Sequence, residues 1–130
     1  MNDKINDILY KLSLSKFRNS FHLRKYMINY IDKTGIDTIK KHTIDFINTK
    51  ISDAYPKNDG KQTPTKNHPT FIAMHHCACC CRSCLEKWHN IPKGRELTKE
   101  EKNYIYRLLM TWIINEYNHQ RNVRNSCNSN

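Results

Sequence analysis

The segment from residue 75 to residue 89 contains five of the six cysteines and three of the seven histidines of the chain. Thiolates and imidazoles at this density are typical ligands of a soft or borderline metal ion, and an ordinary hydrophobic core has no need of them. A bound ion crosslinks the backbone around it, so this segment constrains the fold more than any other. We expect its donor atoms to converge on a single ion.

The spacing within this segment predicts which side chains reach the ion. Cys81-Arg-Ser-Cys84 is a C-x-x-C pair, in which the two intervening residues allow both sulfur atoms to face one ion. His89 follows five residues after Cys84 and reaches the site only if the helix ends there, which the following Asn-Ile-Pro favours. The predicted ligands are His75, Cys80, Cys81, Cys84 and His89.

Zinc is the metal that these ligand types favour, and three alternatives remain open. An iron–sulfur cluster would find enough thiolates here, but their spacing matches no common ferredoxin pattern. Cys81 and Cys84 could instead form a thiol redox pair, because a C-x-x-C motif at the start of a helix has a lowered thiol pKa. The thiols could also be small core residues without a ligand. Cys127 lies in a polar tail and is not a predicted ligand.

Hydrophobic periodicity predicts a mainly α fold with about four helices and at most a short β element near the cysteines. Hydrophobic residues make up only 38% of the 130 residues, so we expect a modest core and one domain, residues 1–118. Residues 119–130 are predicted to form a polar, disordered tail. The predicted helices cover residues 3–12, 23–34, 37–51 and 98–118, and residues 70–74 are the candidate strand.

Local signals mark the ends of these elements. Gly35 is predicted to end the second helix in the C-cap position. Thr98 and Glu101 have the spacing of a capping box and are predicted to start the last helix. Residues 81–88 are predicted to form one or two helical turns, which would place the C-x-x-C pair at a helix start.

Residues 52–69 are predicted to form a long loop, because an Asp-Gly turn and three prolines exclude a long helix. A loop of this length in a small domain is more often functional than not. Asp59, Lys61 and His68 from this loop, together with Glu86, are therefore the candidate catalytic residues of a metal-dependent enzyme. The sequence motifs of zinc deaminases, zinc metalloproteases and P-loop proteins are absent.

The formal net charge of +10 favours anionic partners, above all nucleic acid. Lys16, Arg18, Arg24 and Lys25 are the candidate phosphate contacts; the alternative is a lysine-rich composition with no specific partner. No apolar run approaches the roughly 20 residues of a membrane span. Residues 1–7 are polar and lack the apolar core of a signal peptide, so we expect a cytoplasmic protein with reduced thiols and no membrane partner.

Several stretches of sequence resemble one known family. They are Pro-Lys-Asn-Asp-Gly-Lys-Gln-Thr-Pro at 56–64, His-Pro-x-Phe-Ile-Ala-x-His at 68–75, and Cys-Cys-Arg-x-Cys-Leu-Glu-Lys-Trp-His with the residues that follow it, 80–98. Together with Lys-Phe-Arg-x-Ser-Phe-His-Leu at 16–23, they resemble the mainly bacterial and phage family catalogued as domain of unknown function 4186. The resemblance extends over approximately residues 13–117 and implies no particular activity.

The resemblance does imply a ranking of the candidate residues. All five predicted ligands match the family pattern, whereas the family has threonine at the positions of Cys77 and Cys79. This argues against these two cysteines as ligands and against an iron–sulfur cluster. The chain departs from the pattern at Met74 and His76. The motif positions in the loop are Asp59, Lys61, Gln62 and His68.

Three functional hypotheses follow from the sequence. The first is a small zinc-binding domain that presents a basic surface to nucleic acid. The second is a metal-dependent enzyme, a hydrolase or nuclease, with the loop of residues 59–68 at the metal. The third is a thiol redox protein that uses Cys81 and Cys84.

Overall fold

The computed structural model describes the backbone of residues 2–128 and the side chains of residues 4–123, and it contains no β-strand within that range. Six α-helices account for most of the described chain, and two short helical segments of other types join them. The elements in chain order are α1 (Asn2–Ser13), the 3-10 helix η1 (Arg18–Ser20), α2 (Lys25–Thr34), α3 (Ile36–Phe46), the π-helical turn η2 (Ile47–Ile51), α4 (Pro69–His76), α5 (Arg82–His89) and α6 (Lys99–Asn128).

The prediction of a mainly α fold is confirmed, but there are six α-helices rather than four and the candidate strand is wrong. Its residues, 70–74, belong to α4. The Nδ1 atom of His68 accepts a hydrogen bond from the N–H of Thr70 at 2.9 Å, and Pro69 occupies the first helical position, where its fixed φ favours a helix. This local cap outweighs the strand propensity of the short apolar run.

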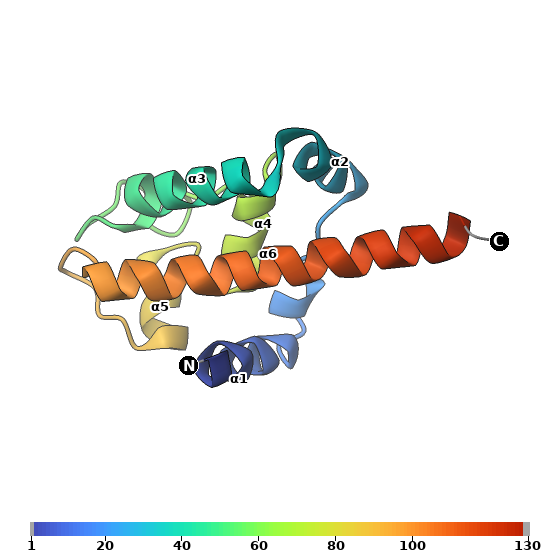
Figure 1. Ribbon diagram of the computed structural model, residues 1–130. Helices are drawn as coiled ribbons and strands as arrows, with labels where there is room; N and C mark the ends of the chain where they lie inside the picture. Colours follow the sequence, from blue (N-terminus) through green and yellow to red (C-terminus); the bar gives the residue numbers. More distant parts are fainter. Residues whose placement is uncertain (1, 129–130) are drawn as a thin grey trace.

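The long helix α6 is the centre of the molecule. Figure 1 shows α3 along one side of α6 and α1 along the other, with α4 running across between them; all three helices contact α6. The face of α6 that they cover carries fully or almost fully buried side chains at spacings of three and four residues, as predicted. They are Ile105, Leu108, Leu109, Trp112 and Ile113.

The start of α6 and its length both have a local cause in the sequence. The predicted capping box is confirmed: Thr98 Oγ1 accepts from the N–H of Glu101 at 3.1 Å, and Glu101 Oε1 accepts from the N–H of Thr98 at 2.9 Å. The helix continues to Asn128, past the end expected near Asn118, because no glycine or proline interrupts the sequence. Arg121 bonds to Asp32 of α2 and holds this extension to the other helices.

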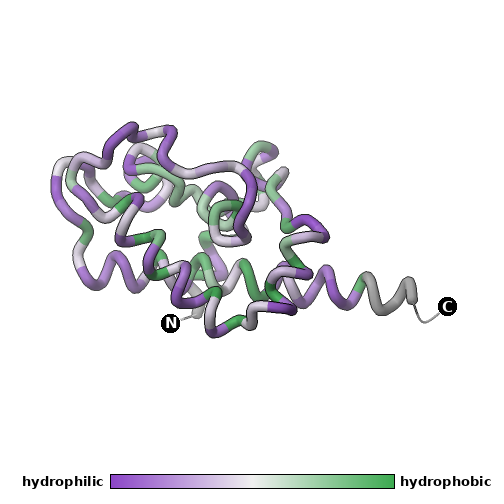
Figure 2. Tube along the Cα trace, turned by 90° about the horizontal axis from the view of Figure 1, so that it is seen from above, coloured by the Kyte–Doolittle hydropathy of each residue, from purple (hydrophilic) through white to green (hydrophobic). Residues whose placement is uncertain are grey.

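The part of α6 that projects beyond the other helices is mostly hydrophilic, as Figure 2 shows. None of the helices in the described range combines the length and the hydrophobicity needed to cross a bilayer. The structure does not describe the side chains of residues 124–130, which include Cys127. That Cys127 is not a metal ligand therefore stays a prediction.

The end of α2 agrees with the prediction, and the element after it is divided in two. Gly35 follows α2 with a φ of 90°, a backbone conformation that side-chain-bearing residues rarely adopt. The predicted helix over 37–51 becomes α3 and the π-helical turn η2, whose Ile47 and Ile51 are buried.

The long loop before α4 is fixed by a buried arginine. Arg82, at the start of α5, is 1% exposed, and its guanidinium donates to four backbone carbonyl oxygens. The acceptors are Asp53 at 2.7 Å, Pro92 at 2.8 Å, Arg95 at 2.9 Å and Ile51 at 3.5 Å. Arg82 therefore connects the loop before α4 and the loop after α5 to the first turn of α5. These bonds fix the position of that turn and of the cysteines beside it.

Candidate metal centre

Three cysteine side chains meet where α4 ends and α5 begins. The sulfur atoms of Cys80, Cys81 and Cys84 all lie within 4.8 Å of one another and can hold a metal ion. The Sγ atoms of Cys80 and Cys84 are 3.6 Å apart. Two sulfurs bound to one tetrahedral zinc at about 2.3 Å are separated by about 3.8 Å, whereas a disulfide requires about 2.0 Å. The spacing of this pair fits shared metal ligands, and all three are free thiols.

A tight reversal of the chain brings these sulfurs together. Ala78 has a φ of 57°, in the left-handed region, and the N–H of Cys79 donates back to Met74 O at 2.8 Å. The chain then enters α5, for which Cys81 is the N-cap: its Sγ accepts from the N–H of Cys84 at 3.4 Å. The C-x-x-C pair therefore starts a helix, as predicted, where backbone N–H groups favour negative sulfur.

Arg18, from η1, is a charged group in contact with two of these sulfurs. It is 7% exposed, and its Nη2 lies 3.1 Å from Cys84 Sγ while its Nη1 lies 3.8 Å from Cys80 Sγ. The same Nη1 donates to His75 O at 2.8 Å. Arg18 is thus buried against the cysteines and does not present its guanidinium to solvent as a phosphate contact, contrary to the prediction. Nothing in the local sequence around Arg18 signals this contact.

The hydrogen bonds within the group concentrate negative charge on one sulfur. Bonds from the thiols of Cys80 and Cys81, and then from Arg18, hold the pKa of the Cys84 thiol well below its usual range. Bonding to its neighbours raises the pKa of Cys80. Cys84 is also the most exposed of the three. The group therefore offers a thiolate to a cation that approaches from the Cys84 side.

The structure places the two predicted histidine ligands outside this group of sulfurs. The Nε2 atom of His75 lies 2.9 Å from Thr63 O, and the ring stacks on Phe21. The Nε2 atom of His89 lies 2.8 Å from Cys77 O, and its Nδ1 lies 2.8 Å from the hydroxyl of Tyr104. Both Nε2 atoms thus face carbonyl oxygens.

Cys77 and Cys79 are completely buried core residues. Burial raises the pKa of both thiols, first of all because a thiolate loses its hydration there. Cys79 Sγ is 3.7 Å from His89 Nε2 but does not belong to the three-sulfur group. The group in the described chain therefore has three cysteines, fewer than the four thiolates that hold a common iron–sulfur cluster.

The loop before α4 contacts the backbone of Cys80 and of the first residue of α5 through small polar side chains. Thr63 Oγ1 donates to Cys80 O at 2.8 Å. Asp59 Oδ1 accepts from the N–H of Arg82 at 3.0 Å and from Gln62 Nε2 at 2.8 Å. Its carboxylate therefore bonds to the first N–H group of α5, where a negative charge stabilises the helix. Lys61 is exposed on this loop. The loop is thus adjacent to the candidate metal centre.

The other two candidate catalytic residues lie elsewhere. His68 caps the start of α4, so this eight-residue helix, roughly 12 Å long, separates it from the cysteines that follow α4. Its Nε2 is 3.0 Å from His42 Nδ1, and its ring contacts Phe46 and Phe71. Glu86 is exposed on α5, where its Oε2 accepts from the N–H of Lys93 at 3.1 Å.

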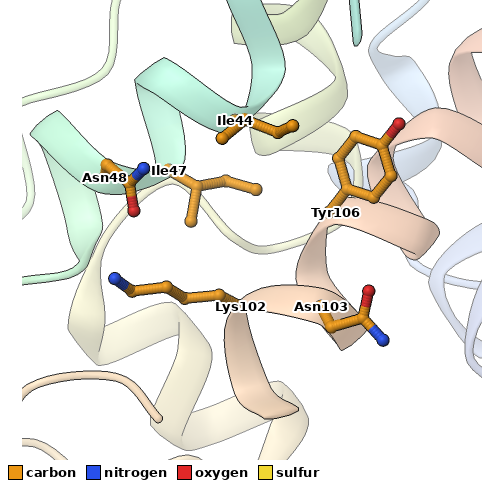
Figure 3. Close-up of a pocket in the computed structure, with 6 residues that line it drawn as sticks. All are labelled: Ile44, Ile47, Asn48, Lys102, Asn103 and Tyr106. Carbon is orange, nitrogen blue, oxygen red and sulfur yellow. The ribbon is translucent and has the colours of Figure 1, made fainter. Parts of the chain in front are cut away.

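Two cavities open on the surface away from the three cysteines. The larger, about 450 Å³, lies between the α3–η2 segment and the start of α6, with Ile44, Ile47 and Tyr106 beside the polar side chains of Asn48 and Lys102 (Figure 3). The second, about 380 Å³, is lined by residues of α1 together with Trp88, His89 and Tyr104. Neither is lined by a cysteine of the three-sulfur group.

Comparison with known proteins links the chain to one family. A family model described as "Domain of unknown function (DUF4186)" matches residues 6–114. The match includes η1, the loop before α4 and the three cysteines. No solved structure matches the chain.

Proposed function

This chain belongs to the DUF4186 family, and we propose that it binds one zinc ion through Cys80, Cys81 and Cys84. The observation that supports the proposal is the convergence of three free thiols within 4.8 Å at the junction of α4 and α5. Three thiolates favour zinc over hard cations such as magnesium, which prefer oxygen ligands. Three protein ligands also leave a fourth tetrahedral position for water or another donor.

The role we propose for the ion is to fix the turn between two short helices, α4 and α5. α4 and α5 have eight residues each, below the length at which a helix is stable without tertiary contacts. The ion would link Cys80 and Cys81, the last residues of that turn, to Cys84 in the first turn of α5. Zinc binds cysteines as thiolates, and cysteines that form disulfides cannot serve as ligands. We therefore also propose a reducing location, the cytoplasm.

The test is metal analysis of protein purified under reducing conditions, with Cys84→Ser and Cys79→Ser as a matched pair. We expect one equivalent of zinc in the wild type and in Cys79→Ser, and a large loss in Cys84→Ser. Both substitutions exchange one sulfur for oxygen, at positions five residues apart, but only Cys84 belongs to the three-sulfur group. Metal-free wild-type protein that also fails to bind added zinc would refute the proposal.

A nucleic-acid partner is the second proposal, and it is supported by the net charge of +10. Arg18 and Arg82 are buried and contribute little to a surface contact, but Lys16, Arg24 and Lys25 are exposed. We propose that these three contact phosphates.

Replacement of Lys16, Arg24 and Lys25 by glutamine should weaken binding to single- or double-stranded nucleic acid and reduce its salt dependence. The control has the same change in net charge: glutamine at the exposed Lys57, Lys61 and Lys66. Equal losses in both triple variants would point to a diffuse charge effect, and affinity that is absent or independent of salt would remove the proposal.

The enzyme and redox alternatives have less support. Asp59 and Glu86 each accept a hydrogen bond from a backbone N–H group, so one oxygen of each carboxylate has a structural partner. The redox alternative needs Cys81 and Cys84 to cycle through a disulfide without metal. Zinc bound at one equivalent in the reduced protein, with no reducible disulfide formed at Cys84 in air, would separate metal binding from redox chemistry.

A further inference from the structure

We propose that Arg18 is the charge partner of the zinc site: its guanidinium donates hydrogen bonds to the metal-bound sulfurs of Cys84 and Cys80 and thereby raises zinc affinity and protects the ligands from electrophiles. The inference rests on the proposed zinc binding and assigns a positioning residue from η1, 62 and 66 residues away in sequence from the two sulfurs.

Arg18 is held in place independently of the cysteines. The N–H of Arg18 donates to Ser15 Oγ at 3.2 Å in the turn between α1 and η1. The Phe17 ring lies 5.1 Å from the guanidinium carbon, and His75 O accepts from Nη1 at 2.8 Å. These contacts fix the guanidinium before any ion binds, so little additional ordering is needed when the sulfurs take up a metal.

The charges explain why an arginine is buried at this position. Three thiolates carry a charge of −3, and a zinc ion reduces it to −1. One guanidinium, which stays protonated at any physiological pH, brings the sum to zero. A buried charge without an opposite charge is costly, and in the described chain no ion pair joins Arg18 to a carboxylate. The sulfur group supplies the counter-charge, whether as the Cys84 thiolate or as a metal–thiolate group with a net charge of −1.

Arginine suits this role better than lysine. Its planar guanidinium presents several N–H groups in a fixed fork, and here two nitrogens reach two sulfurs and one carbonyl oxygen. An N–H group bonded to a thiolate withdraws electron density from the sulfur. The zinc-bound sulfurs therefore become weaker nucleophiles, and they react more slowly with alkylating agents and oxidants.

The test compares Arg18→Gln, Arg18→Lys and Lys33→Gln. Lys33→Gln removes one positive charge from an exposed position of α2 and is the control. Zinc affinity is measured by competition with a chromogenic chelator, and the reactivity of the zinc-loaded thiols by the rate of iodoacetamide alkylation. We expect Arg18→Gln to bind zinc about 10–100-fold more weakly, as is typical for loss of a partner that bonds to metal ligands. Alkylation of Arg18→Gln should be faster, Arg18→Lys should be intermediate, and Lys33→Gln should equal the wild type.

The outcomes separate this inference from the proposed function. A wild-type protein that binds no zinc refutes the zinc site itself. A wild type that binds zinc, with Arg18→Gln equal to Lys33→Gln in both affinity and alkylation rate, overturns the role of Arg18 alone. If Arg18→Gln does not fold, Arg18→Lys decides: lysine keeps the positive charge but lacks the planar guanidinium, so alkylation as slow as in Lys33→Gln would overturn the inference.

Discussion

The protonation state of His68 is determined by its two hydrogen bonds. Its Nδ1 accepts from the N–H of Thr70 at 2.9 Å, so Nδ1 carries no proton. The neutral ring therefore carries its proton on Nε2 and donates it to His42 Nδ1 at 3.0 Å. Protonation of Nδ1 would place two donors against each other at the start of α4. Burial, and next the charge of His42, lower the pKa of His68 to about 4.

This lowered pKa predicts a loss of stability in mild acid. The unfolded chain takes up a proton on His68 near pH 6.5, but the folded chain does so only near pH 4. The stabilising contribution of neutral His68 is therefore complete above about pH 6.5 and is lost as the pH falls to about 4, by an amount on the order of 2 kcal/mol. Urea unfolding from pH 7 to pH 4 measures this loss.

His68→Asn is the informative variant, because asparagine still caps α4 and does not titrate. It should retain the stability of the wild type more fully as the pH falls from 7 to 4. His119→Asn changes the composition in the same way at an exposed position and serves as control. Equal pH profiles for the wild type and His68→Asn would contradict the assignment.

At the scale of the elements, the capping box at the start of α6 shows why some features can be read from sequence. Thr98 and Glu101 are three residues apart and satisfy each other's backbone N–H groups, so no distant contact is needed. The cap of α4 gives no such signal, because the acceptor is a histidine, which is not among the usual capping residues. The prediction that α6 ends near residue 118 is wrong, because polar composition does not stop a helix where no helix-breaking residue is present.

Removal of the Thr98 hydroxyl tests the capping box. Thr98→Ala should lower the free energy of unfolding by about 1 kcal/mol, because the N–H of Glu101 loses its acceptor. Thr111→Ala on the same helix is the control: its hydroxyl bonds only to the carbonyl of Arg107 within the helix, and alanine has the higher helix propensity. Denaturant unfolding at pH 7 measures both variants. A loss for Thr111→Ala as large as that for Thr98→Ala would contradict the role of the cap.

The contribution of Glu101 to the stability of the fold depends on pH, and its sign follows from the pKa of the carboxyl group. The side-chain hydrogen bond from Arg95, with those from Thr98, lowers the pKa of Glu101 to about 2. The ionised carboxylate therefore stabilises the fold above the unfolded pKa near 4.5, and this contribution is lost as the pH falls towards 2. Glu101→Gln should show a smaller loss of stability between pH 5 and pH 2 than the wild type.

In the molecule as a whole, the sequence indicates the segment in which donor atoms gather, but not the neighbours of each side chain. The density of cysteine and histidine singles out residues 75–89, and three of the five predicted ligands, Cys80, Cys81 and Cys84, do converge there. The neighbours of each imidazole depend on the packing of segments far apart in sequence, such as His89 against Tyr104 of α6. Arg18 reaches the sulfurs for the same reason. Spacing rules describe contacts within one turn of chain and contain no information on such long-range contacts.

The last prediction concerns the metal and the stability of the entire fold. Zinc that binds the folded chain and not the unfolded chain stabilises it by about 2.7 kcal/mol when free zinc is a hundred times the Kd. In a domain of this size, that corresponds to a Tm higher by on the order of 10 °C. A chelator should therefore lower the Tm of the wild type and of Cys79→Ser, but not that of Cys84→Ser, which already lacks a ligand. Because the two short helices meet at the site, loss of the ion should increase hydrogen exchange first in α4 and α5. An unchanged Tm on chelation of zinc-loaded protein would show that the helices pack without the ion.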